Sequence, residues 1–162
     1  MSKKYKVGDK IVEFGEIYRI FKIDKKKQND GSVEEIIHYK PLSKIGNAST
    51  IICSIPLSKV DQTAIRDPLT KEQFTFFLKE LQEIKVEIFN DINEARSALK
   101  SNTPLENLTA IKALKKESTT VDYFNKNKTD LLNFAIEKVA LEFSLVFNTS
   151  LQKAKDKINL YI

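Results

Sequence analysis

Few residues in this chain carry the chemistry of a catalytic or metal site. Cys53 is the only cysteine and His38 the only histidine, and they lie 15 positions apart in β-like sequence. They form no internal disulfide and no Cys/His zinc cluster. The 22 carboxylates are spread among lysines, as on solvated helix faces, and no Gly-rich phosphate loop is present. We therefore expect a protein that is not an enzyme and that needs no cofactor or metal.

Length, composition and the distribution of apolar residues disfavour a membrane protein. The chain has 162 residues, of which 41% are apolar, which suits one ordinary domain or two small ones. No apolar run approaches the ~20 residues of a membrane helix, and the N-terminal lysines precede Val7-Gly8-Asp9 instead of an apolar signal region. We therefore expect a cytoplasmic protein without membrane contact.

The net charge of +5 is unevenly divided along the chain. Residues 1–66 hold 13 Lys and Arg against 8 Asp and Glu, whereas residues 67–162 hold 14 against 14. A neutral second part weakens the case for a strong phosphate-tracking surface there, although charges can segregate to opposite faces.

The first third of the sequence has the pattern of β-strands. Three segments are rich in β-branched residues or alternate apolar with polar residues: 10–23, 33–39 and 49–55. Turns are predicted at Asp30-Gly31 and Ile45-Gly46-Asn47, and Pro56 ends the last strand because it cannot donate a ladder hydrogen bond. We predict three or four strands in a small, bent antiparallel sheet of the Tudor or SH3-like kind within residues 1–66.

The remainder, residues 67–162, has almost uninterrupted helical sequence. Five helices are predicted, near 71–84, 86–101, 104–116, 127–147 and 150–160. Three starts show a hydroxyl residue followed three positions later by Glu or Gln: Thr70…Gln73, Thr103…Glu106 and Thr149…Gln152. Pro104 suits a first helical position, and Ser118-Thr119-Thr120 is predicted to be a loop.

The fourth predicted helix is the most apolar and should form the centre of the bundle. Its apolar residues recur at helical spacing: Leu131, Leu132, Ala135, Ile136, Val139, Ala140, Phe143 and Phe147. The sequence as a whole therefore predicts an α+β protein, in which a small antiparallel sheet precedes an all-helical bundle of about five helices.

The order of these parts, with the residues at their joint, resembles the CarD/CdnL family of bacterial RNA-polymerase-binding transcription regulators. The similar segments are 5–12, 15–23, 50–66, 99–105, 131–135 and 141–143. The resemblance spans nearly the whole chain, and it rests on the order and spacing of motifs that are each modest alone.

The resemblance implies that the β-rich module binds the β subunit of RNA polymerase, while the helical domain touches promoter DNA beside the melted region and stabilises the open complex. A small sheet can bind a partner by adding a strand to its edge. We assign the polymerase contact to an edge strand with flanking charges: Ile51, Ile52, Cys53, Ser54 and Ile55, with Arg19, Lys22 and Lys40. The alternative is that this strand merely completes a small barrel.

The DNA contact departs from the family pattern. Members commonly place a tryptophan, followed by basic residues, at the start of the second helical segment, but this chain has no tryptophan and has Asn90-Asp91 after Phe89. Phe89 is a candidate minor-groove wedge, or else it is buried between helices. The candidate phosphate contacts, each also readable as a solvated charge, are Lys85, Arg96, Lys100, Lys126 and Lys128.

The expected function is therefore a non-catalytic transcription regulator that binds polymerase, contacts promoter DNA weakly and without strong sequence preference, and lies at the nucleoid through the polymerase. An alternative is a polymerase-binding adaptor whose neutral helical half recruits another protein without touching DNA. A sequence-specific repressor is disfavoured because no helix-turn-helix with a basic recognition helix stands out. We expect a monomer.

Overall fold

The computed structural model describes residues 5–42, 51–101 and 103–162. The chain divides into two compact units, Met1–Pro68 and Leu69–Ile162, which we call the β unit and the helical unit. The sequence places the division two residues earlier, after Arg66. A four-stranded antiparallel sheet is followed by a helical bundle, which confirms the predicted α+β class.

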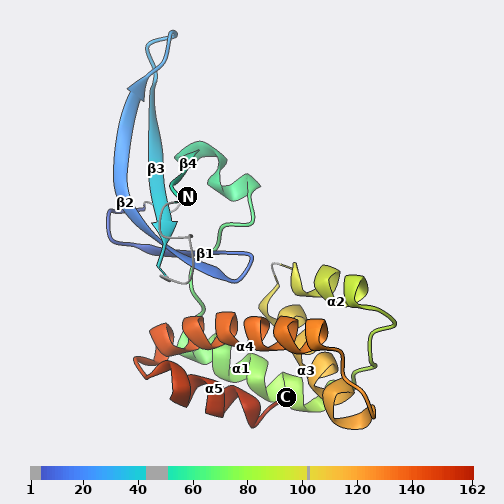
Figure 1. Ribbon diagram of the computed structural model, residues 1–162. Helices are drawn as coiled ribbons and strands as arrows, with labels where there is room; N and C mark the ends of the chain where they lie inside the picture. Colours follow the sequence, from blue (N-terminus) through green and yellow to red (C-terminus); the bar gives the residue numbers. More distant parts are fainter. Residues whose placement is uncertain (1–4, 43–50, 102) are drawn as a thin grey trace. The chain divides into compact units, whose positions relative to one another are not determined.

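The sheet of the β unit is a meander whose strands pair in chain order (Figure 1). Its strands are β1 (Lys10–Glu13), β2 (Glu16–Lys27), β3 (Val33–Pro41) and β4 (Cys53–Pro56). β2 and β3 are much longer than their neighbours, so the hairpin that they form projects beyond the rest of the sheet (Figure 1). The predicted segment 10–23 thus contains β1 and the first part of β2.

The turns between β1 and β2 and between β2 and β3 depend on residues with positive φ. Phe14 and Gly15, at φ 49° and 78°, join β1 to β2, and this pair of left-handed residues matches the twist of the flanking strands. At the second turn Gly31 has φ 84°, and Asp30 Oδ1 accepts hydrogen bonds from the backbone N–H and the hydroxyl of Ser32. The predicted Asp30-Gly31 turn is therefore confirmed, whereas the predicted turn at Ile45-Gly46-Asn47 lies outside the described residues.

One face of the sheet carries the core of the β unit. Alternate side chains of the strands pack there with two residues that follow β4: Ile11, Ile20, Ile37 and Tyr39, with Val60 and Ile65. Val60 belongs to the 3₁₀ helix η2 (Leu57–Gln62), which begins directly after Pro56. Pro56 does end the last strand, as predicted.

The chain returns to the free side of β1 before it leaves the β unit. Val12 and Arg66 exchange two backbone hydrogen bonds of 2.8 and 2.9 Å. Part of the β1 edge is thereby covered. β4, at the opposite side of the sheet, pairs within the described part of the chain with β3 alone.

The described residues of the helical unit form five α-helices. They are α1 (Lys71–Glu83), α2 (Ile92–Leu99), α3 (Pro104–Thr120), α4 (Lys126–Phe147) and α5 (Leu151–Asn159). α4 supplies side chains to two apolar clusters. Its first half packs with α2 and α3 around Ile111 and Leu114, and its second half packs with α1 and α5 around Phe74 and Ile158. The prediction that this helix forms the centre of the bundle is therefore confirmed.

The predicted helix starts are only partly correct. Thr70 and Gln73 form the reciprocal capping box before α1. Before α3, Pro104 is the first helical residue, but the Thr103 side chain makes no capping hydrogen bond. α5 is capped by the hydroxyl of Ser150, which accepts from Lys153 N, instead of by Thr149.

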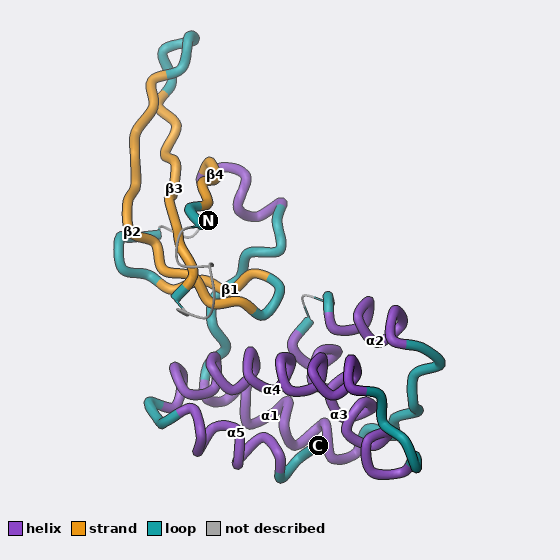
Figure 2. The backbone as a smooth tube through the Cα atoms, in the orientation of Figure 1, coloured by secondary structure: helices purple, strands orange, loops and turns teal. Residues whose placement is uncertain are grey.

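Two predicted boundaries were wrong. Ser118-Thr119-Thr120 is not a loop but the last turn of α3, where each hydroxyl donates to a carbonyl oxygen three or four residues earlier. The second helix does not begin near residue 86. Residues 84–91 form a non-helical connection between α1 and α2 (Figure 2), and α2 starts only after Asp91, whose carboxylate accepts from the N–H groups of Asn93 and Glu94.

The described helices include none that is both long and apolar enough to cross a membrane. Within the described residues there is also no group of three or more His, Cys, Asp and Glu side chains arranged to hold a metal ion.

Candidate partner-binding surfaces

The first candidate surface is the edge strand β4. The strand begins at Cys53, so the prediction of a strand over 49–55 was too long at its start. Ile51 and Ile52 precede it with side chains 52% and 65% exposed, and residues 49 and 50 lie outside the described residues. Within β4 the side chains alternate: Cys53 and Ile55 pack on the core of the β unit, while Ser54 is exposed. The strand therefore offers one backbone edge, preceded by two exposed isoleucines.

Cys53 lies among groups that keep its thiol protonated. Partial burial, with a smaller contribution from the charge of Glu13, raises the pKa of Cys53. On the same face, burial raises the pKa of Tyr18 to about 12, and burial also raises that of Tyr39, which packs edge-to-face on Tyr18 at 5.3 Å between ring centroids. A thiol with a raised pKa is a poor nucleophile. Cys53 is therefore a packing residue of the edge strand.

The second candidate surface is the face of the sheet opposite the core, which we call the outer face. The three predicted flanking charges, Arg19, Lys22 and Lys40, all project from it. Arg19 pairs directly with Lys40 in the β2–β3 register, and Lys22 pairs with His38, two residues before Lys40. The structure thus brings these three cations together.

The outer face also contains a cation that the sequence analysis missed. Lys10 of β1 lies opposite Arg19, so that Lys10, Arg19 and Lys40 form one row across three strands. All three side chains are exposed. The alternation of side chains along each strand could have predicted that each of these residues lies on the outer face. The row also depends on the register in which the strands pair, and the sequence does not reveal that register.

The cations of the outer face differ in their partners. Lys22 Nζ lies 2.7 Å from Asp24 Oδ2, and His38 Nε2 lies 3.0 Å from the same oxygen. The hydrogen bond from Lys22, and then the charges of Lys22 and His38, lower the pKa of Asp24. Lys40 Nζ lies 5.5 Å from the centroid of the Phe21 ring. Lys10 and Arg19 form no ion pair with any described residue.

The third candidate surface, on the helical unit, contains the predicted DNA contacts. Lys85 and Phe89 belong to the connection between α1 and α2. Lys85 is exposed, but Phe89 is half-buried against the cluster formed by α2, α3 and α4. Of the two alternatives for Phe89, the structure shows packing between helices. The exposed apolar side chain at this point is its neighbour Ile88, at 47%.

Two lysines of α3 hold this connection in place. Lys112 Nζ donates to the backbone carbonyl oxygens of Leu81 and Ile84, at 2.6 and 2.9 Å, and Lys116 Nζ donates to that of Val86 at 2.8 Å. A cation at the C-terminal end of α1 also suits the helix dipole. These contacts provide donors for carbonyl groups that a continuous helix would have paired internally. They stabilise the non-helical chain over 84–91, so that the second helix begins only at Ile92.

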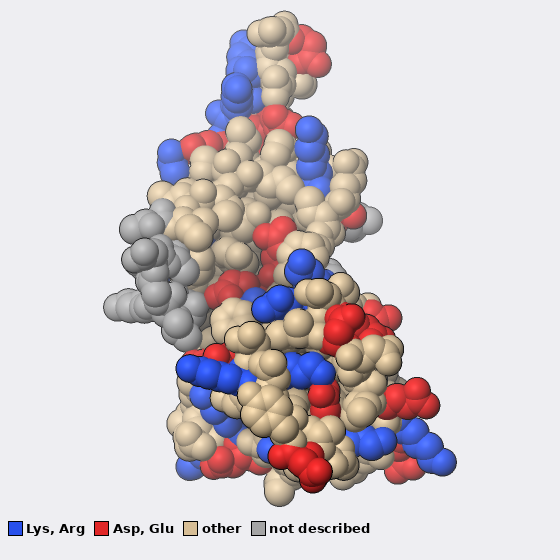
Figure 3. Space-filling view, turned by 45° about the vertical axis from the view of Figure 1, so that its right-hand side comes forward, with Lys and Arg blue, Asp and Glu red and all other residues tan. Residues whose placement is uncertain are grey.

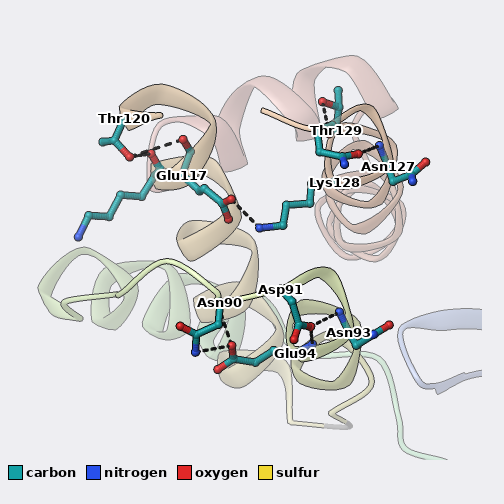
Figure 4. A network of polar contacts seen from close by, with 11 residues as sticks. Asn90, Asp91, Asn93, Glu94, Glu117, Thr120, Asn127, Lys128 and Thr129 are labelled. Atoms are coloured by element: carbon teal, nitrogen blue, oxygen red, sulfur yellow. Dashed lines mark hydrogen bonds and ion pairs between the residues drawn. The ribbon is translucent and has the colours of Figure 1, made fainter. Parts of the chain in front are cut away.

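Lys128, predicted as a phosphate contact or else a solvated charge, is largely buried and paired. Its Nζ lies 2.6 Å from Glu117 Oε1, and the two side chains are only 12% and 10% exposed. Figure 4 shows this pair, which joins α3 to the start of α4, near the loop that carries Asp91. Backbone hydrogen bonds from Glu94 and Asn93, and then the charge of Lys128, lower the pKa of Asp91. Lys128 is therefore largely buried within the helical unit, where Glu117 binds its ammonium group.

The remaining predicted cations are exposed. Arg96 is in the last turn of α2 and Lys100 is the C-cap of that helix, whereas Lys126 is the first residue of α4, after the N-cap Asn125. Figure 3 shows Lys and Arg atoms interspersed with Asp and Glu atoms over the face of the helical unit that it presents. This arrangement offers one pair of cations at the end of α2 and single cations elsewhere, with carboxylates between them.

The three surfaces are thus an edge strand, a face with a cationic row and a helical unit with scattered cations.

No protein-family model matches the sequence, and no curated protein sequence matches it.

Proposed function

We propose that this chain is a non-catalytic transcription regulator that binds the β subunit of RNA polymerase through its β unit and contacts promoter DNA through its helical unit. The proposal rests on the resemblance of its motifs to the CarD/CdnL family. The structural observation that supports it is β4, which pairs with β3 on one side and, among the described residues, has no strand on its other side.

β4 is suited to strand addition for two physical reasons. An edge strand has a row of backbone N–H and C=O groups that can pair with an extended segment of a partner. Ile51 and Ile52, exposed just before the strand, add apolar surface that a partner would cover. Of the predicted flanking charges, Lys40 lies on β3, next to β4, whereas Arg19 and Lys22 lie on β2, one strand further from the edge.

The test is calorimetric titration of the full chain with the lobe of its cognate polymerase β subunit. Ile52→Pro removes a backbone donor beside β4 and should abolish binding, whereas Ile52→Thr keeps that donor and the strand propensity and should retain most of it. Full binding by the proline variant would exclude strand addition at this edge. Absence of binding by the unmodified chain would remove the proposed polymerase contact altogether.

A second candidate function is an adaptor that binds polymerase without DNA contact through the helical unit. Two observations favour it: Lys128 is occupied by Glu117, and Phe89 is packed against the helical cluster. The two candidates differ in the behaviour of Lys85, Arg96, Lys100 and Lys126. If these residues contact promoter DNA, replacing them with Gln weakens DNA binding at low salt; if the adaptor is correct, binding does not change.

A further inference from the structure

Lys10, Arg19 and Lys40 form a row of exposed cations on the outer face that have no ion-pair partner among the described residues. The three residues occupy directly opposed positions on β1, β2 and β3, which lie side by side (Figure 1). Side chains at such positions start about 5 Å apart and project from the same face of the sheet. Like charges placed directly opposite each other destabilise a sheet. No carboxylate of the described residues forms an ion pair with this row.

We propose that this row binds the phosphate backbone of a nucleic acid. A bound anionic chain would remove the repulsion that the row creates. A phosphate chain needs only cations at suitable spacing, because each nucleotide carries one charge. An acidic peptide bound as a strand would also need backbone partners, and a sheet directs its N–H and C=O groups toward neighbouring strands instead of out of its face.

The surroundings of the row fit a nucleic acid as well. Phe21 lies on the outer face at the β-bulge between Ile20 and Lys22, and its ring centroid lies 6.3 Å from that of His38 and 5.5 Å from Lys40 Nζ. Proteins that bind single strands combine basic surfaces with aromatic rings on which bases stack. Lys22 lies beside the row on β2, but its charge is balanced by Asp24.

The helical unit cannot account for the excess of positive charge. The sequence places the whole excess in residues 1–66. Within the helical unit, several lysines are already occupied by carbonyl groups or carboxylates: Lys112, Lys116, Lys128 and Lys155. The β unit therefore provides a nucleic-acid contact beyond the one proposed for the helical unit, and it uses Arg19 and Lys40, which the sequence analysis assigned to polymerase.

The salt dependence of binding gives the expected size of the effect. Each phosphate contact contributes about −0.7 to the slope of log K against log salt for a single strand, and about −0.9 for a duplex. Three contacts give a slope of about −2 to −3, which corresponds to a loss of roughly 20- to 40-fold in affinity between about 50 and about 200 mM salt.

The test uses the full chain, a fluorescein-labelled mixed-sequence single strand, the matching duplex and labelled polyglutamate, in fluorescence anisotropy over a KCl series. The triple variant Lys10→Gln/Arg19→Gln/Lys40→Gln should reduce the magnitude of the salt slope by about 2 to 3, the share of its three contacts. The matched variant Lys71→Gln/Lys79→Gln/Lys153→Gln, with three exposed helical lysines replaced, should keep it. Comparing the two oligonucleotides then identifies whether a single strand or a duplex is preferred.

Thermal unfolding shows whether the first triple variant is folded. Its midpoint should equal or exceed that of the unmodified chain, because the substitutions remove repulsion. A folded triple variant with an unchanged salt slope would overturn the proposal. So would polyglutamate binding as tight as oligonucleotide binding, which would identify a surface for acidic proteins. Polymerase is absent from the assay, so the result does not depend on the proposed polymerase contact.

Discussion

Lys112 of α3 donates a 2.6 Å hydrogen bond from its Nζ to the backbone carbonyl oxygen of Leu81, near the end of α1. The same ammonium group reaches the carbonyl oxygen of Ile84, so one side chain satisfies carbonyl groups on both sides of the helix end. The last carbonyl groups of a helix have no partner within the helix. A lysine from a neighbouring helix therefore fixes where α1 stops and where the chain leaves it.

Replacing Lys112 with Met should destabilise the helical unit. The substitution keeps much of the aliphatic stem but removes the charged donor, so we expect the free energy of unfolding to fall by about 2 kcal/mol. Urea unfolding followed by circular dichroism measures the change. Lys79→Met, at an exposed lysine of α1 with no described ion pair, should change it by less than about 0.5 kcal/mol. Equal effects of the two variants would contradict the role of Lys112.

The buried pair of Glu117 and Lys128 should show strong coupling in a double-mutant cycle. Lys128→Met alone leaves a carboxylate nearly buried without its cation, which should lower the free energy of unfolding by about 3 kcal/mol. The double variant Glu117→Gln/Lys128→Met removes both charges and should recover most of that loss. Additive losses in denaturant unfolding would show that the two side chains act independently.

Asp91 should make the stability of the helical unit depend on pH in the acid range. Hydrogen bonds from Glu94 and Asn93 lower its pKa below the ordinary value of 3.8. A group with a lowered folded-state pKa stabilises the folded state above its unfolded pKa and loses that contribution as the pH falls through the folded pKa.

Asp91→Asn is the variant that tests this dependence. Asparagine still caps the helix but carries no charge. The unmodified chain should therefore have the higher melting temperature near neutral pH, and the difference should shrink as the pH falls below about 4. Melting curves over a pH series measure it. A difference that stays constant down to strongly acid pH would show that the charge of Asp91 has no part in capping α2.

Cys53 should react slowly with an alkylating reagent near neutral pH. Burial and the charge of Glu13 raise the pKa of its thiol, so less thiolate is present at a given pH than for an unperturbed cysteine. The rate of iodoacetamide modification should keep rising at pH values where a free cysteine has levelled off. Glu13→Gln removes the smaller of the two causes and should move the profile part of the way back. A profile identical to that of free cysteine would mean that β4 does not shield the thiol.

Local signals in the sequence predicted much of the fold. The capping box of Thr70 and Gln73, the Asp30-Gly31 turn and the apolar stripe of α4 involve residues close together in the chain, and the structure contains all three. The hydroxyl cluster at 118–120 was wrongly predicted to be a loop. Hydroxyl residues are typical of loops, but here their side chains bond to carbonyl groups of their own helix.

The features that the sequence did not reveal depend on distant partners. The connection over 84–91 contacts Lys112 and Lys116 of α3, which follow their partners by 28 and 30 residues in the chain. Lys128 of α4 pairs with Glu117 of α3. The row on the outer face requires the pairing of three strands in one register. Each side chain taken alone resembles an ordinary surface charge. Only the tertiary arrangement distinguishes the lysines that bind carbonyl groups or carboxylates of the protein from those that are free to bind a partner.

The unequal lengths of chain that connect the paired strands imply an order in which the sheet folds. β2 and β3 are joined by the short turn at Asp30-Gly31 and pair over nearly their whole length, so their contacts require closure of only a small loop. β4 reaches β3 only after a longer excursion of the chain, and Arg66 meets Val12 across more than fifty residues. Loop-closure entropy rises with the length of chain enclosed. The central hairpin should therefore form first and act as the template, while the edge strand β4 and the contact of Arg66 join in the last step of folding.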